Sequence, residues 1–480
     1  MNTVDKKIKI AIIGAGVAGS STALYLAKLG LTITLFEKEK SLISGPPFCH
    51  LHAGGNLYRE ISDKQCVKLL KQSIDFLRFY PYIVDYRPTV IVLPTSDPST
   101  PEALLPRLKL LQEKYKTLIT EDDSNEVLGK YEDYYKLYTK EQIVKLKQKS
   151  VVKKPQTLDE WMIPVAKNID IEKIQFPLIM VQEYGLNLFR LAAGVRLKLE
   201  MLQNISLLTQ TNVVNVEKSN ESKKWSVSYV RENSKYVDDF DYLINAAGFR
   251  SGKIDDFLGT ECKSMVEFKA AYISKWKQSS TTLFPEIIFH GKRGTPQGMG
   301  QFTPYPNGYF QLHGMTKDIT LYEDGLVANT SLSCQPELKT DFIEKIEKSW
   351  TQDEIDARTK NAIKHIAQFI PNFSEAKVGS KPLFGAQQIP GDDPTLRVAE
   401  VSFPTKKYAR CEIVKVSSVL DMIDAIVKSL IELNYIDKSL YGKRDFKEHK
   451  IPSERDISSM AKTIAKERNY PIDLSSRMVQ

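Results

Sequence analysis

The first forty residues alternate between apolar runs and a glycine turn, in a pattern that predicts a strand, a helix and a second strand. An apolar run at 8–13 precedes the glycines, and apolar positions at helical spacing continue to Leu29, with Gly30 as the helix stop. A second apolar run at 31–36 follows. The chain therefore opens with a βαβ unit.

The rest of the chain continues this mixture of helices and strands. We expect helices at 65–79, 101–118 and 187–203, strands at 89–94, 207–216, 225–231 and 242–246, and a polar, added helical segment at 119–175. Strands dominate the first part of 261–375 and two helices follow, while 376–436 contains strands and a closing helix. The segment 437–480 is polar and is expected to be a surface appendage with a short helix near 456–468.

Composition places the chain among ordinary globular proteins of two or three domains. Of its 480 residues, 42% are hydrophobic and 26% are charged. Five scattered cysteines argue against a disulfide scaffold and a cysteine-rich zinc site, and favour a reducing compartment. We see no signal peptide and no apolar run long enough to span a membrane. The expected location is cytoplasmic, and the net charge of +8 allows peripheral attachment to the inner face of the cytoplasmic membrane.

The strongest motif is Gly-Ala-Gly-Val-Ala-Gly at 14–19, directly after a strand and at the start of a helix. Gly14 allows the tight turn, Gly16 lets the backbone approach a diphosphate, and Gly19 lets helix and strand pack closely. Val17 and Ala18 present the helix N-terminus, and Glu37 stands 23 residues after Gly14, where a carboxylate accepts hydrogen bonds from ribose, with Lys38 beside it. The motif predicts a dinucleotide site.

Two later segments favour FAD over NAD as the dinucleotide. The apolar strand at 241–248 ends in small residues and would return beside the first strand. The block from 381 to 394, a strand at 396–401 and a helix at 417–433 would close the same sheet. No second glycine motif exists for an NAD(P)H domain, so electrons would leave to oxygen, a quinone or a redox protein.

These segments resemble the D-amino-acid oxidase-like flavoproteins, among which malate:quinone oxidoreductases are the nearest members. The resemblance implies an α/β fold in which a GR2-type Rossmann-like FAD-binding domain is interleaved with an α+β substrate domain on a mixed, largely antiparallel sheet. The FAD-binding domain would take 1–83, 186–260 and 376–436, and the substrate domain 84–185 and 261–375. By the resemblance Gly14, Gly16, Gly19 and Glu37 hold FAD, Val213 holds the adenine through its backbone, and Ala247 and Gly248 lie near the cofactor. One departure is that 408–418 contains no glycine before the final helix, so contacts to the ring cannot be transferred there.

Three places could supply the chemistry. On a predicted hairpin at 298–315, Tyr309, Gln311 and His313 share one face, and His313 is the candidate general base; an ordinary surface histidine is the alternative. In the loop 46–56, His50 and His52 could contact the flavin, and a covalent bond to a histidine or cysteine is conceivable; no cluster with metal-ligand spacing is seen. Arg250 and Arg410 could each hold a carboxylate.

The resulting prediction is a FAD-dependent oxidoreductase that oxidises a small carboxylate substrate, a hydroxy acid or an amine, and passes electrons to a quinone or oxygen. One alternative is a flavin-dependent RNA-modifying enzyme, although the even mixing of lysines with acidic residues argues against a nucleic-acid partner. The other alternative is a non-catalytic flavin-binding sensor, which would not need a polar strand face.

Overall fold

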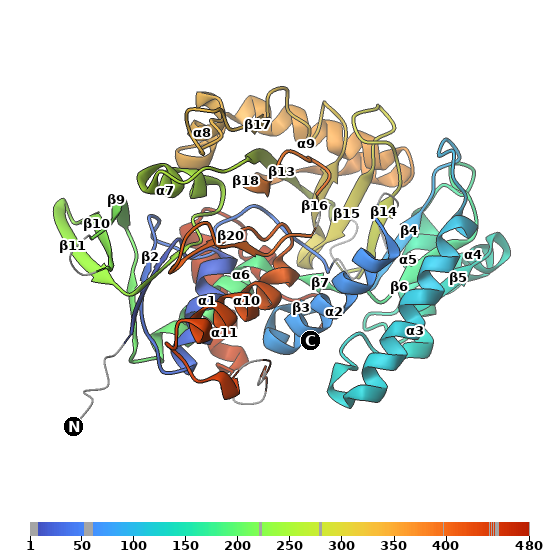
Figure 1. Ribbon diagram of the computed structural model, residues 1–480. Helices are drawn as coiled ribbons and strands as arrows, with labels where there is room; N and C mark the ends of the chain where they lie inside the picture. Colours follow the sequence, from blue (N-terminus) through green and yellow to red (C-terminus); the bar gives the residue numbers. More distant parts are fainter. Residues whose placement is uncertain are drawn as a thin grey trace.

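The computed structural model describes residues 8–51, 61–219, 223–277, 281–396, 398–440, 442, 444, 446 and 451–479. Within these residues the chain forms two large sheets that lie side by side and are covered by helices (Figure 1). One sheet is parallel and Rossmann-like, and the other is mixed and largely antiparallel. The predicted fold class is confirmed.

The first sheet is assembled from the beginning, the middle and the end of the chain. Its strands lie in the order β19-β20-β12-β1-β2-β8, and each neighbouring pair is parallel except β19 with β20. Their bounds are β1 Lys9–Ile13, β2 Thr32–Phe36, β8 Ile205–Leu208, β12 Tyr242–Asn245, β19 Val401–Ser402 and β20 Tyr408–Cys411. Because Ile10 pairs with Tyr242 in parallel register, the predicted return of the later strand beside the first is confirmed.

Helices α1 (Val17–Lys28), α6 (Leu188–Glu200) and α10 (Val419–Glu432) share one hydrophobic core with this sheet. Small residues of α1, including Gly19, Ser20 and Ala23, are buried, so the helix lies close to the strands. The helix stops as expected, because Gly30 takes a positive φ of 83°.

The second sheet has the order β17-β13-β16-β15-β14-β4-β6-β5, and β18 also pairs with β13. Only the β4–β14 pair is parallel among these described strands. The bounds are β4 Thr89–Val92, β5 Tyr135–Tyr138, β6 Leu178–Val181, β13 Ser264–Lys275, β14 Glu286–Phe289, β15 Gly300–Pro304, β16 Tyr309–Gly314, β17 Leu326–Ala328 and β18 Lys377–Pro390. β15 and β16 form the predicted hairpin. Helices α8 (Thr340–Glu347) and α9 (Gln352–Ala367) cover one face of this sheet (Figure 1).

The remaining elements connect or flank the two sheets. Helices are α2 Asp63–Phe79, α3 Leu105–Glu121, α4 Lys140–Lys147, α5 Leu158–Asn168 and α7 Ser251–Leu258. Strands β3 Val84–Asp85 and β7 Gly185–Leu186 form a short pair, and β9 Thr211–Lys218, β10 Trp225–Arg231 and β11 Ser234–Phe240 form a small antiparallel sheet.

Three sequence predictions of elements are wrong. The single strand at 207–216 is two strands, because Gln210 takes a positive φ of 52° and turns the chain from β8 into the small sheet. The segment 119–175 is not wholly helical, since its Tyr-rich part forms β5 at the edge of the second sheet. Residues 396–400 form no strand among the described positions, and β20 closes the first sheet instead.

The segment from 376 to 390 also belongs elsewhere than expected. It forms the long strand β18, which pairs with β13 of the second sheet from Pro390 against Ser264 to Lys377 against Lys275. We therefore place the return to the first domain after Pro390 rather than at 376.

The C-terminal segment is packed into the fold, so the prediction of a surface appendage is wrong. Helix α11 (Glu454–Glu467) buries Ile457, Ala461, Ile464 and Ala465, which follow the i, i+4, i+7, i+8 spacing of one helix face. Its overall polarity hides this apolar stripe. The last described backbone N–H groups, of Met478 and Val479, donate to the Asp85 carboxylate. None of the helices among the described residues is long and apolar enough to cross a membrane.

Candidate active site

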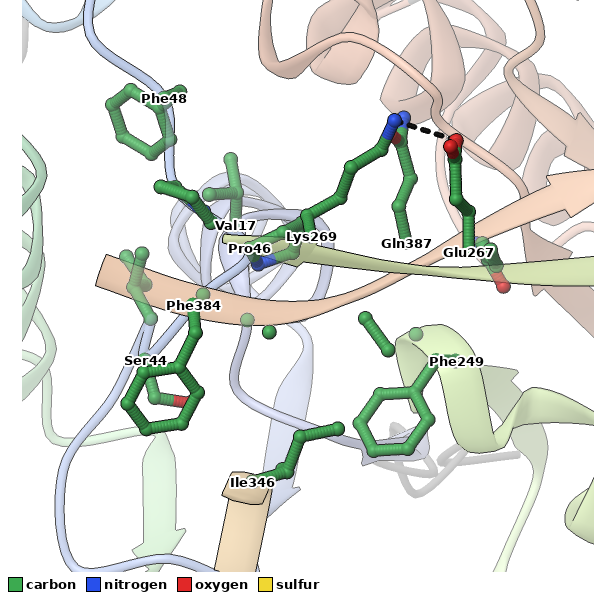
Figure 2. A pocket seen from close by; sticks show the side chains of 18 of the residues that line it. Val17, Ser44, Pro46, Phe48, Phe249, Glu267, Lys269, Ile346, Phe384 and Gln387 are labelled. Atoms are coloured by element: carbon green, nitrogen blue, oxygen red, sulfur yellow. Dashed lines mark ion pairs between the residues drawn. The ribbon is translucent and has the colours of Figure 1, made fainter. Parts of the chain in front are cut away.

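A cavity of about 1600 Å³ lies between the two sheets and is lined by residues of both. This volume exceeds the range of about 300–1000 Å³ that a single small ligand usually needs, so it has room for a dinucleotide and a substrate. Figure 2 shows Val17 at the start of α1, the loop residues Ser44 and Pro46, and Lys269 of β13 around this space.

The glycine turn forms one end of the cavity. Gly14 has a positive φ of 97°, and a Cβ there would overlap the carbonyl oxygen of Ala246. Gly16 has no atom within 4 Å of an ideal Cβ position and opens onto the cavity beside Val17 and Ala18. Gly19 lies behind the turn, where a Cβ would overlap the Gly14 carbonyl. The backbone amides at the start of α1 are thus accessible, as a diphosphate requires.

Glu37 stands at the end of β2 beside this turn. Its carboxylate accepts hydrogen bonds from the Ala15 N–H at 2.7 Å and the Glu39 N–H at 2.8 Å, and it lines the cavity. Burial raises the pKa of Glu37, and the backbone donors oppose that shift. Val213, Ala247 and Gly248 line the same end. These residues fit the adenosine half of FAD.

A three-residue ion-pair group spans the cavity wall near Glu37. The Glu347 carboxylate at the end of α8 accepts from Lys38 Nζ at 2.7 Å and from an Arg250 guanidinium nitrogen at 2.6 Å. All three residues line the cavity. Arg250 therefore lines the cavity, where it shares the single carboxylate of Glu347 with Lys38.

His50 lies in a fully buried charge network. Its Nδ1 is 2.7 Å from one Glu286 oxygen, and the other oxygen accepts from Arg87 at 2.5 Å. Burial alone would lower the pKa of His50, but Glu286, and after it Cys49, raise it to about 10. Burial would likewise raise the pKa of Glu286, but His50 and Arg87 lower it to about 2. His50 lines the cavity, and His52, the other predicted flavin contact, lies outside the described residues.

Cys49, His50 and Glu286 bring three ligand atoms within 4.8 Å of one another, a grouping that the sequence did not indicate. Donors already occupy it. The Gln301 amide donates to Cys49 Sγ at 2.8 Å and to Glu286 at 2.6 Å, and Arg87 holds the other carboxylate oxygen. A guanidinium in contact with the carboxylate disfavours a metal cation, so we interpret the group as an ion-pair network.

The three residues predicted to share one face of the hairpin do not all line the cavity. Gln311 and His313 line the cavity, while Tyr309 points elsewhere, with Lys275 Nζ 4.3 Å from its ring centroid. His313 Nδ1 lies 3.3 Å from the Ala270 carbonyl oxygen, which makes Nδ1 the protonated nitrogen of the neutral ring. Burial, and then the charge of Lys269, lower the pKa of His313 to about 4. The ring is neutral at pH 7.

Sequence reasoning missed the charged group next to His313. Lys269 and Arg293 each lie 2.5 Å from a different oxygen of Glu267, and all three line the cavity. Burial would raise the pKa of Glu267, but the two cations lower it to about 2. Figure 2 shows Lys269, Glu267 and Gln387 pointing to the same side. Period-two alternation on 264–275 places Glu267 and Lys269 on one face, but the sequence does not show which face meets the cavity.

Arg410 is not where the prediction places it. Its guanidinium is 3.2 Å from Asp255 and 2.9 Å from Glu412, and it lines a small separate pocket behind Gly248. Arg410 belongs to β20, an inner strand of the first sheet, and its side chain is held between Asp255 and Glu412. Arg410 therefore lies outside the candidate site.

The comparisons with known proteins agree with this geometry. Residues 9–142 match the DAO family model, described as FAD dependent oxidoreductase. None of the curated proteins matches the sequence.

Solved structures show the same fold across the chain. The glycerol-3-phosphate dehydrogenase of Bacillus halodurans, complexed with FAD, aligns with a TM-score of 0.56 and 11% identity over 98% of this chain and 74% of that chain. Glycine oxidase of Geobacillus kaustophilus gives 0.52 and 12% over 91% and 99%. L-amino acid deaminase of Proteus vulgaris gives 0.56 and 12% over 90% and 95%.

Proposed function

We propose, from the match of residues 9–142 to the DAO family model and from the geometry of the cavity, that this chain is a FAD-dependent oxidoreductase that oxidises a small carboxylate-bearing hydroxy acid or amine. The observation that carries the proposal is the position of two cations, Lys269 and Arg293, on the cavity wall beside His313 and Gln311. Both cations contact the carboxylate of Glu267, which holds them in place. An anionic substrate group at this wall would be attracted to them.

The neighbouring side chains fit the remaining needs of the reaction. Bound FAD would accept the hydride from the substrate carbon. Lys269 and Arg293 would hold the substrate carboxylate, and Gln311 would orient the substrate. The unprotonated Nε2 of His313 would accept the proton from the hydroxyl or amine. An anion beside Lys269 would offset the part of the His313 pKa shift that Lys269 causes, while the larger part, from burial, remains.

His50 is unsuited to accepting that proton because Glu286 already keeps it protonated. Its fixed positive charge at the cavity would instead favour a negatively charged partner, such as a reduced flavin. The adenosine diphosphate part of FAD is proposed to be held by the glycine turn and the residues around it: Gly14, Gly16, Val17, Ala18, Gly19, Glu37, Lys38, Val213, Ala247 and Gly248.

The named activities of the structural neighbours support a small polar substrate. The three neighbours are named as acting on glycerol 3-phosphate, glycine and L-amino acids. Within that range we favour a carboxylate, of the malate:quinone oxidoreductase type, with a quinone or oxygen as electron acceptor. The net charge of +8 favours peripheral contact with an anionic membrane, where a quinone would be available.

An anaerobic titration of the flavin absorption tests the proposal. Purified holoenzyme is mixed with a panel of hydroxy acids, amino acids and uncharged alcohols of the same size. We expect a carboxylate to bleach the flavin band, and the same compound to require higher concentration in Lys269→Met. Reduction by the uncharged analogue at the same concentration would overturn the assignment. Admitting oxygen or a soluble quinone to the reduced enzyme then identifies the acceptor.

A further inference from the structure

Two basic side chains from the C-terminal part of the chain line the cavity, away from the Glu267 group. Lys381 stands near the start of β18, and Arg468 directly follows α11. Lys381 Nζ lies 4.7 Å from the ring centroid of Tyr470 and 5.9 Å from that of Phe384. None of the ion pairs found among the described residues includes either Lys381 or Arg468.

Arg468 connects the C-terminal segment to the loop that follows β2. Its guanidinium donates to Ser41 Oγ and to the backbone carbonyls of Leu42 and Ile43. The Ile43 N–H in turn donates to the carbonyl of Ala15 in the glycine turn at 3.1 Å. The charge of Arg468 is therefore fixed one loop away from the N-terminus of α1.

The positive charge of Arg468 makes the protonated form of Lys381 less favourable. Burial lowers the pKa of Lys381, and the charge of Arg468 lowers it further. Burial also lowers the pKa of Arg468, and Tyr470, Glu37 and Glu467 oppose that shift only in part. Two like charges in a partly enclosed space are stabilised when an anion is placed between or beside them.

The order of the chain indicates which anion this is. Glu37 lies beside the glycine turn, and Pro46 packs closely against Gly385 of β18 in the second sheet. The segment 41–43 that Arg468 holds lies between Glu37 and Pro46 in the chain. In FAD the diphosphate is the part that connects adenosine to the ring-bearing half.

We propose that Lys381, supported by Arg468, binds the diphosphate of FAD together with the N-terminus of α1. The C-terminal segment is then part of the cofactor site. Lys381 supplies a charge-assisted hydrogen bond, while Arg468 holds the 41–43 backbone in position and adds positive charge.

Flavin-free protein, titrated by calorimetry, tests the proposal without any substrate. The ligands are FAD, which carries both halves, ADP, which carries the diphosphate half, and riboflavin, which carries the ring half. We expect Lys381→Met to weaken FAD and ADP binding about tenfold and to leave riboflavin binding unchanged. Lys381→Arg should restore most of the affinity, since it keeps the charge.

Lys348→Met is the matched control. Lys348 lines the same cavity but is paired with Glu344 at 2.9 Å, so we expect unchanged affinity for all three ligands. Unchanged ADP affinity in Lys381→Met would overturn the proposal. A loss of riboflavin affinity equal to that of FAD would also overturn it, because the side chain would then act on the ring half. A failure of the proposed carboxylate oxidation would leave these affinities unaffected.

Discussion

Replacement of Glu286 by Gln tests whether the buried network around His50 is an ion-pair network. Glu286 is fully buried and is the carboxylate partner of both His50 and Arg87. Removing its charge leaves two buried cations without that partner. Breaking a buried pair in this way costs about 3–5 kcal/mol of unfolding free energy.

The pH dependence of this loss follows from the two pKa shifts. The folded pKa of His50, about 10, lies above its unfolded value of 6.5, so its contribution is complete below pH 6.5 and is lost as pH rises through 10. The folded pKa of Glu286, about 2, lies below 4.5, so its contribution is complete above pH 4.5 and is lost as pH falls through 2. The network therefore contributes most between pH 4.5 and 6.5.

Urea unfolding of the wild type and Glu286→Gln at pH 6 and pH 9.5 measures these quantities. We expect a difference of about 3–5 kcal/mol at pH 6 that becomes smaller at pH 9.5. A remainder comes from Arg87, which keeps only the 4.0 Å contact with Asp85 as an ion pair. The control is Glu172→Gln, which removes the exposed partner of Lys140 and should cost less than about 1 kcal/mol. A difference that does not change with pH would refute an imidazolium at His50.

Three further outcomes are expected. His313→Asn should keep FAD but slow flavin reduction about 10²–10⁴-fold in stopped-flow mixing. In the wild type, the pH at which kcat/KM begins to decrease on the acid side should lie below 6.5. The reason is that the pKa of His313 in the free enzyme is lowered to about 4, so the base stays neutral down to that pH. Lys269→Met should raise the KM for the carboxylate substrate about tenfold or more, whereas the exposed Lys140→Met should not change it; equal values would exclude a carboxylate contact. Gly14→Ala should be purified without flavin absorbance, because its Cβ would overlap the Ala246 carbonyl and its φ is 97°; full flavin content would contradict the tight turn.

The nucleotide end of the site could be predicted because its signals are local. The turn at Gly14, the start of α1 and the carboxylate of Glu37 lie within 24 residues, and each requires a particular residue type at a particular spacing. The strand that returns at 242–245 was also evident, since it is apolar and ends in small residues.

The substrate end could not be predicted in the same way because it is made by pairing between distant strands. Lys269 reaches the cavity only because β13 lies between β16 and β18, and β18 comes from a segment that the sequence pattern assigned to the other domain. Arg410 shows the opposite error. Its position near the C-terminal block looked favourable, but Asp255, 155 residues earlier, holds it outside the cavity.

The packing of the C-terminal helix could not be predicted from the average polarity of its segment. Four apolar residues on one face suffice to dock α11 against α6, although most of the remaining positions are charged or polar (Figure 1). Arg468 at its end carries no motif, and only the fold places it beside Ser41.

The interleaving of the first sheet has a consequence for the timing of biosynthesis. The ribosome releases β1 and β2 first, but β20, which completes the sheet beside β12, is synthesised about 370 residues after β2. At about 5–20 residues per second this delay is roughly 20–75 s. Throughout it the nascent nucleotide half has an open sheet edge and lacks α10 and α11, so it depends on protection from aggregation. Stable retention of the cofactor would begin only once the last residues have emerged, which makes flavin loading a late event in the maturation of this protein.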